Sequence, residues 1–308
     1  MEERFRKNSK SWCLCPHAPS IRKLVDKIHC TCGEERRIYE WNWEDDSCVN
    51  VVLSNENRDV LFHPVYSSGT AAVKGRVAFK QNLHHYWEVK ILTNLYGTDI
   101  MIGVGTSKLV LSNWKLRFSS MLGYDTESWG YSYKGKIQHN RLMCRYGSYF
   151  TIGSLVGVHL DMWTGTLQYY LNRRPLGIAF RSLKNYDLYP MVSSTAAQSA
   201  MRITCCLSQE PTLQAECLKV ITKNPKLLEQ LRNMPGIMRM LSAKYFWLIP
   251  PPPIEKKKIS LELEDECVLS LDTLNKNFKD CKRFRSSLLQ PRADPDHISY
   301  RRYLRRST

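Results

Sequence analysis

The sequence contains no apolar run that approaches the roughly 20 residues of a membrane-spanning helix, so we expect no membrane segment. A secretory leader is not expected either, because the charged stretch Met1–Lys7 has no apolar stretch behind it. These two absences predict an intracellular protein, in the cytoplasm, the nucleus or both. In that reducing environment the eleven cysteines would be free thiols or metal ligands rather than disulfides.

Motifs that mark common enzymes are also missing. There is no Gly-x-Ser-x-Gly nucleophile turn, no phosphate-binding Gly-x-x-x-x-Gly-Lys loop and no His-Glu-x-x-His zinc motif. Gly103-Val-Gly105 lacks the third glycine of a dinucleotide loop, because Lys108 stands at that place. Cys217 lies in an apolar helical stripe, which favours packing over nucleophilic chemistry. We therefore expect a non-catalytic protein without a cofactor, zinc excepted.

Positive charge is present in large excess, at a formal net charge of +16. Such an excess is compatible with binding to nucleic acid and equally with simple solubility. The basic residues are scattered rather than concentrated on one helix, which favours solubility. The densest cluster, Arg301–Arg306, is either a nuclear-import element or a solvated tail, and the sequence does not decide between them.

Four regions follow one another along the chain. Residues 1–35 form a cysteine-rich, basic N-terminal arm, and residues 36–207 are dense in short apolar or alternating runs. Residues 210–249 change to helical periodicity. Four prolines, Pro250–Pro253, then begin an extended spacer, and the rest of 250–308 is predicted to be a charged, largely disordered tail.

The region 36–207 is predicted to be an antiparallel β-sandwich. His85–Ile91 alternates between two faces, as in a strand with period two. Asp99–Gly105 is almost continuously apolar, as expected for a strand covered on both faces. Gly165 supplies the backbone freedom of a hairpin turn between two further strands.

The region 210–249 is predicted to be a small helical domain of three helices. Its first helix starts at Thr212, and Leu213, Cys217 and Ile221 recur every four residues on one stripe. A small Cys within that stripe lets a partner backbone approach closely. From spacing alone the stripe could equally pack against the chain's own sandwich.

Two Cys-x-Cys pairs stand in the N-terminal arm. Cys13, Cys15, Cys30 and Cys32 could bind zinc through four thiolates and so order a segment with little core. Their spacing differs from the usual Cys-x-x-Cys, so free thiols in a flexible arm are the competing interpretation.

A set of short motifs gives the chain a resemblance to a known family. In the order found in SPRY domains it contains Trp87–Glu88, Gly103–Gly105, Ser128–Tyr131, Gly157–Asp161, Gly165–Leu167, Leu176–Ala179 and Leu188–Pro190. The Leu-x-x-x-Cys-x-x-x-Ile pattern after Thr212 is similar to the elongin-binding part of a SOCS box. A SPRY-like region followed by a SOCS-box-like helix resembles the SPRY domain-containing SOCS box proteins. The run Cys30–Arg36 is similar to one member of that family in particular.

The resemblance implies a bent, mainly β SPRY sandwich followed by a three-helix SOCS box, acting together as a substrate adaptor of a ubiquitin ligase. Elongin C would bind Leu213, Cys217 and Ile221, bringing elongin B and a cullin–RING scaffold, and the bound target would be ubiquitinated and degraded by the proteasome. The cullin contact would fall at Met234, Pro235 and Ile237, where the family's Leu-Pro-x-Pro is reduced to one proline. That departure leaves the choice of cullin open.

The resemblance also implies a peptide pocket that reads an asparagine-containing segment of the target. Its residues would be Tyr66, Gly97, Thr98, Phe118, Thr195, Ala196 and Ala197. The family commonly has Tyr at Phe118 and Val-Trp-Gly at Thr195–Ala197, so we expect a different asparagine-containing motif.

Two alternatives to these readings stay open. The pocket residues could merely close loops of the sandwich. The chain as a whole could be a basic nuclear scaffold, or a nucleic-acid-associated SPRY protein, without ligase recruitment.

Overall fold

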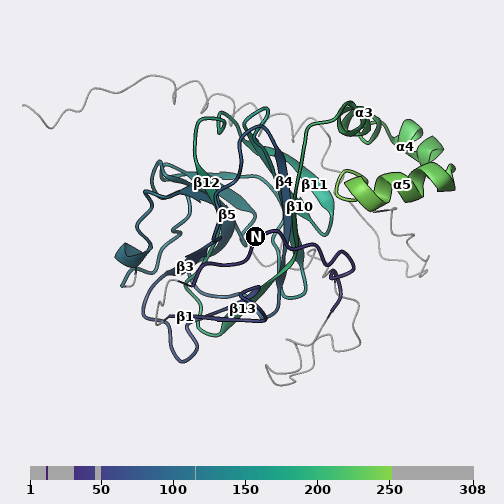
Figure 1. Cartoon of the computed structure of the whole chain (residues 1–308). Helices are drawn as coiled ribbons and strands as arrows, with labels where there is room; N and C mark the ends of the chain where they lie inside the picture. The colour runs from purple at the N-terminus through teal and green to yellow at the C-terminus, as the bar shows by residue number, and fades with distance from the viewer. Residues whose placement is uncertain (1–11, 13–30, 46–49, 115, 252–308) are drawn as a thin grey trace, which may run out of the picture. The chain divides into compact units, whose positions relative to one another are not determined.

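The computed structural model describes residues 12, 31–45, 50–114 and 116–251, and across them the fold is two packed antiparallel sheets followed by three helices (Figure 1). One sheet has seven strands in the order β1-β2-β13-β4-β9-β10-β11. These strands are Val51–Ser54, Asp59–Phe62, Ser199–Gln209, His84–Ile91, Leu155–Asp161, Thr166–Leu171 and Arg174–Phe180.

The other sheet has six strands in the order β3-β12-β5-β6-β7-β8. They are Ala71–Lys74, Leu188–Ser194, Ile100–Thr106, Ser128–Ser132, Lys136–His139 and Leu142–Arg145. A short 3-10 helix, η1, spans Leu111–Trp114. The predicted mainly β sandwich is confirmed.

The core lies between the two sheets and is rich in aromatic rings. Trp43 and Trp87 are fully buried there, and the ring of Phe79 stacks on Trp87 with centroids 4.9 Å apart. In β5, Gly103 is required by close strand packing, because a Cβ at this position would meet the Trp129 carbonyl oxygen at 1.9 Å. Burial of this large apolar surface is the main stabilising contribution to the sandwich.

Strand β4 is buried on both faces, since all eight of its residues lie below the surface. Trp87 and Val89 belong to the core between the sheets. The side chains of Tyr86, Glu88 and Lys90 belong to the other face, where Glu88 is fully buried and Lys90 nearly so. The alternation of this strand is therefore retained, but its polar face is covered by other segments of the chain.

The helical region folds as three short helices, α3 Leu213–Ile221, α4 Pro225–Arg232 and α5 Pro235–Tyr245. Thr212 caps α3 by accepting a hydrogen bond from the Ala215 N–H, and Asn224 caps α4. A proline stands at the start of both α4 and α5, where its missing N–H costs no helical hydrogen bond. The expectation of three helices in this region is confirmed.

The helices have a small core of their own that continues onto β4, β10 and β13. It joins Ala215, Leu218, Leu241 and Tyr245–Leu248 to Tyr86, Tyr170, Cys205 and Leu207. In the described part of the chain, none of the helices is long and apolar enough to cross a membrane.

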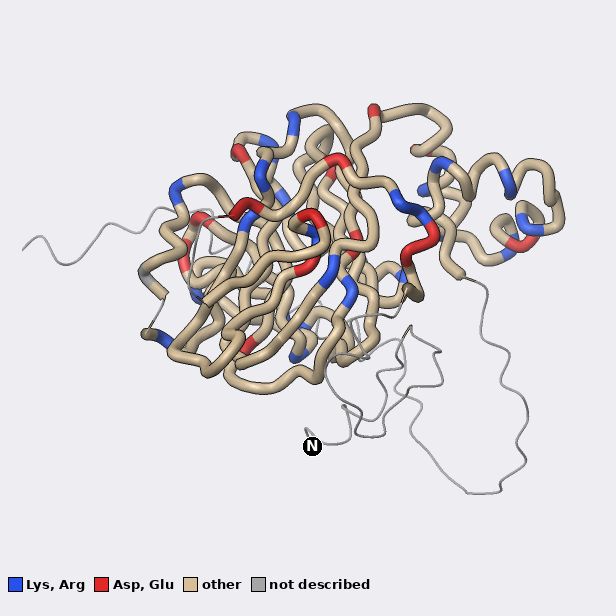
Figure 2. Tube along the Cα trace, turned by 60° about the horizontal axis from the view of Figure 1, so that its bottom comes forward, with Lys and Arg blue, Asp and Glu red and all other residues tan. Residues whose placement is uncertain are grey.

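Charged residues of both signs are interspersed along the described backbone. Figure 2 shows Lys and Arg positions spread over many strands and loops, with Asp and Glu among them, rather than gathered on one element. This distribution agrees with the scattered pattern seen in the sequence.

Candidate functional site

The first candidate site is an apolar ridge on α3. Leu213 is 81% exposed, Val220 is 64% exposed, and Cys217 is exposed between them. Ile221 lies half-buried at the edge of this α3 ridge. The ridge thus presents two branched side chains with a small thiol in the middle.

The opposite face of α3 provides the packing. Ala215 and Leu218 are buried in the core of the helical region. Because these residues hold the helix in place, Leu213 and Cys217 remain available for another molecule. The arrangement separates the structural face of the helix from the exposed one.

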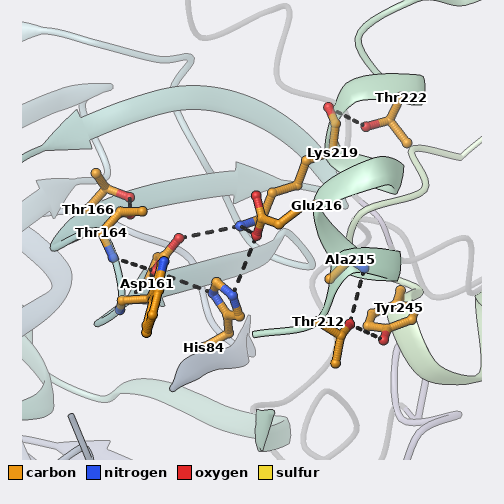
Figure 3. A network of polar contacts seen from close by, with 11 residues as sticks. His84, Asp161, Thr164, Thr166, Thr212, Ala215, Glu216, Lys219, Thr222 and Tyr245 are labelled. Carbon is orange, nitrogen blue, oxygen red and sulfur yellow. Dashed lines mark hydrogen bonds and ion pairs between the residues drawn. The ribbon is translucent and has the colours of Figure 1, made fainter. Parts of the chain in front are cut away.

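Polar contacts fix the helix without using the ridge, and Figure 3 shows them from close by. The Thr212 hydroxyl lies 2.8 Å from the Tyr245 hydroxyl. The Lys219 ammonium contacts Asp161 at 3.3 Å and Glu216 at 2.7 Å. These bonds tie the start of α3 to α5 and its middle to the end of β9.

A buried histidine completes this network. His84 Nδ1 lies 3.5 Å from Asp161, and its Nε2 lies 3.7 Å from Glu216. Burial lowers the pKa of His84, and the positive charge of Lys219 lowers it further. The carboxylates of Asp161 and Glu216 act to raise it, and the lowering effects prevail. Although burial acts to raise it, the pKa of Asp161 is lowered by the Thr164 N–H bond and by the charges of His84 and Lys219.

The beginning of α5 is exposed as well. Met234 stands at the N-cap position without a side-chain capping bond, Pro235 is the first helical residue, and Ile237 and Met240 face outward. The predicted cullin-contact residues therefore all lie at the surface. Leu241 points inward, so α5, like α3, has one packed face and one open face.

The second candidate site is a cluster of loops at one end of the sandwich. Tyr66 is 73% exposed and Phe118 is 53% exposed, with Gly97 and Thr98 also at the surface. Hydrogen bonds hold these loops together. Ser67 donates to the Thr195 carbonyl at 2.7 Å, and Lys134 Nζ donates to the Thr98 carbonyl at 2.6 Å.

Two of the predicted pocket residues lie underneath these loops. Thr195 is 3% exposed and Ala196 is 1% exposed. The Thr195 hydroxyl donates to the Asp99 carbonyl and accepts from the Asp99 N–H, both at 3.0 Å. Gly97 has a φ of +81°, and a Cβ there would meet Thr195 Oγ1 at 2.9 Å. The side chains of Thr195 and Ala196 thus shape the loops from below, and Ala197 is half-buried beside them.

Asp99 is a buried residue that the sequence did not single out. Its carboxylate accepts hydrogen bonds from Ser132, at 2.6 Å, and from Ser120. Burial raises the pKa of Asp99, and these serine hydroxyls partly oppose that effect. Asp99 thereby links the loop that follows Phe118 to strand β6.

The loop cluster also exposes apolar side chains that motif comparison missed. Val65, Tyr96 and Leu116 are all exposed on the same loops. Val65 and Tyr96 stand next to Pro64 and Gly97, a signal too common to be specific, and Leu116 between two basic residues gave no signal. Like Tyr66 and Phe118, they add exposed apolar surface to these loops.

Comparison with known proteins identifies the SPRY domain and the family of the chain. A family model described as SPRY domain matches residues 84–207. The chain is 39% identical over 252 residues to SPRY domain-containing SOCS box protein 3 of Xenopus tropicalis, covering 78% of this chain and 69% of that protein. The chain belongs to the SPRY domain-containing SOCS box protein family. The family prediction, including the likeness to one member, is confirmed.

More distant relatives match shorter stretches. Protein gustavus of Drosophila melanogaster is 31% identical over 185 residues, covering 56% of this chain and 65% of that protein. Among solved structures, the SPRY domain of human HERC1 is 18% identical with a TM-score of 0.44, covering 53% of this chain and 96% of that chain.

In this SPRY domain-containing SOCS box protein, the matched residues begin at β4 and end within β13. The sandwich is larger than that match, because β2 pairs with β13 and β3 pairs with β12. Helices α3–α5 follow directly after β13.

The zinc prediction stays a prediction. Cys13, Cys15 and Cys30 lie outside the described residues, as do the tail from residue 252 and its arginine cluster. Cys32 is described, and its backbone carbonyl accepts a hydrogen bond from Lys90 Nζ at 2.6 Å. Within the described ranges no group of three or more His, Cys, Asp or Glu is arranged to hold a metal.

Proposed function

We propose that this protein is a non-catalytic adaptor of a ubiquitin ligase, in which the SOCS box recruits elongin C and the SPRY sandwich holds a target. The observation that carries the proposal is the α3 ridge, where Leu213 and Cys217 are exposed on a helix that packs through its other face. Such a helix suits insertion into a groove of a second protein.

The physical contribution of the ridge is hydrophobic. Full burial of a Leu or Val side chain stabilises a contact by about 1.5–3 kcal/mol. Cys217 adds little volume, so the partner backbone can approach between Leu213 and Val220. Elongin B joins through elongin C, and a cullin–RING scaffold contacts the open start of α5 at Met234, Pro235 and Ile237.

The target side of the proposal rests on the loop cluster. An extended segment containing asparagine would lie across the exposed Gly97 and Thr98, with Tyr66 and Phe118 as apolar walls. Thr195, Ala196 and Ala197 would act by holding the loops in shape. A captured target would then be ubiquitinated and degraded.

The test is affinity purification of the full chain from cells, followed by mass spectrometry. Leu213→Glu combined with Cys217→Glu is expected to remove elongins B and C together, while proteins bound by the loop cluster remain. Val77→Glu is a matched control, because Val77 is exposed on the sandwich. Equal recovery of the elongins with the double variant and with the control would refute the adaptor function.

A second pair of variants tests the target side. Tyr66→Ala with Phe118→Ala is expected to lose target proteins and to keep the elongins. If every non-ligase protein recovered with the wild type is also recovered with this pair, the loop cluster is not the target site.

A further inference from the structure

Arg173 occupies an unusual place in the hairpin between β10 and β11. It is the second residue of a two-residue turn, with φ of +59°, and Asn172 before it has φ of +54°. Glycine is the residue usually preferred at this second position, because a side chain is disfavoured there. Arg141 has the same conformation in the turn between β7 and β8, with an exposed side chain, so Arg173 is set apart by its side-chain contacts rather than by its backbone.

The guanidinium of Arg173 binds a buried carboxylate of the sandwich. Its Nε donates to Glu88 Oε1 at 2.9 Å, and an Nη donates to Glu88 Oε2 at 3.1 Å. Glu88 is fully buried, and the Tyr86 hydroxyl also donates to it, at 2.7 Å. Paired hydrogen bonds of this kind fix the plane of the guanidinium.

The same guanidinium contacts residues near the N-terminus. It donates to Glu35 at 3.1 Å and lies over the ring of Trp12, 4.9 Å from the ring centroid. The Gly33 carbonyl lies 3.4 Å from the same nitrogen that reaches Glu35. Residues 33–35 are thereby joined to β4 through one side chain.

The face of the guanidinium meets the segment that follows α5. Arg173 lies 5.5 Å from the ring centroid of Phe246, and Arg36 lies over the same ring at 4.8 Å. Phe246 and Trp247 pack on Tyr86, with centroids 5.6 and 5.1 Å away. Since Phe246 comes directly after α5, this ring is one of the places where the helical box attaches to the sandwich, beside the contact of Lys219 with Asp161.

We propose that Arg173 is a positioning residue that fastens the N-terminal segment Gly33–Arg36 and the SOCS box to the SPRY sandwich in one fixed relation. Three segments far apart in the sequence meet at its single planar group. The fixed relation serves the proposed adaptor function, because it keeps the α3 ridge at a constant distance from the loop cluster. The attachment itself does not depend on that function.

The experiment measures the distance between sandwich and box in the full-length protein. Spin labels are placed through unnatural amino acids at Asn94 and Lys226, both exposed, and the distance distribution is recorded by electron spin resonance. We expect one narrow distribution in the wild type. Arg173→Lys keeps the charge but loses the paired bonds and the planar face, and it is expected to broaden the distribution at least two-fold.

A double variant removes Arg173 without leaving a buried charge unpaired, which could unfold the protein. Arg173→Met alone would leave the Glu88 carboxylate buried without its cation, so it is combined with Glu88→Gln, which can keep the bond from Tyr86. Phe246→Leu tests the attachment from the other side, because it removes the ring but keeps an apolar side chain. Both are expected to broaden the distribution while the sandwich stays folded by circular dichroism.

The exposed Arg181→Lys is the matched control and is expected to leave the distribution narrow. A wild type that is already broad, or Arg173→Lys and Phe246→Leu distributions as narrow as the control, would overturn the proposal. Failure of the adaptor function would show differently, as wild-type protein that captures no elongin whatever the distance distribution.

Discussion

Cys217 lies between Leu213 and Val220 on the α3 ridge, and its size limits how closely a partner backbone can approach. Cys217→Ala keeps a small apolar group, so binding of a purified elongin B–C complex should stay within about three-fold of the wild type. Cys217→Phe should weaken binding at least ten-fold, about 1.4 kcal/mol. Isothermal titration measures both. Equal affinity for the two variants would mean that the thiol position does not face the partner.

His159 is buried beside His84, with ring centroids 5.4 Å apart. Burial, with the nearby charges of His84 and Lys219, lowers the pKa of His159 from 6.5 to about 3. The unfolded chain therefore binds a proton first, so stability is complete above pH 6.5 and is lost as the pH falls.

The protonation of His159 on unfolding makes the free energy of unfolding depend measurably on pH. Between pH 6.5 and 4.5 the free energy of unfolding should fall by up to about 1.4 kcal/mol per pH unit for this histidine. His159→Gln should flatten the dependence by that amount in denaturant titrations. A slope unchanged by the substitution would show that His159 is not held neutral in the folded protein.

Helix α3 depends on Thr212, whose hydroxyl both caps the helix and contacts Tyr245. Thr212→Ala should cost about 0.5–2 kcal/mol and should speed amide hydrogen exchange in Leu213–Ile221. Thr212→Ser retains the hydroxyl and should preserve protection. Exchange that is equal in the two variants would contradict this role of the cap.

Among the elements, strands and helix starts were predictable because their signals are local. The alternation of His85–Ile91 and the cap at Thr212 each depend on neighbouring residues only. The burial of Glu88 was not predictable, since its partner Arg173 is distant in sequence. For the same reason the two bonds of the Thr195 hydroxyl to the backbone of Asp99 were not predictable from the sequence, and the place of Thr195 in the peptide pocket stays a prediction.

In the molecule as a whole, the residues just before the sandwich contribute to its stability. Glu34 contacts Arg202 at 2.9 Å, and the Cys32 carbonyl accepts from the buried Lys90. Removing residues 1–36 should therefore lower the free energy of unfolding by about 1.5–3 kcal/mol for each lost bond to a charged group. Removing residues 1–30 leaves these bonds in place and should cost less. Thermal unfolding compares the two truncations, and equal midpoints would contradict the expectation.

The account as a whole depends on the α3 ridge serving as the ligase-binding face, and calorimetric titration of purified elongin B–C into the full-length protein tests this most directly. We predict saturable one-to-one binding by the wild type and by Val77→Glu, and no detectable heat with Leu213→Glu/Cys217→Glu, although that variant keeps the wild-type circular dichroism spectrum. Binding of the double variant with wild-type affinity, or no binding by the wild type, would contradict the account.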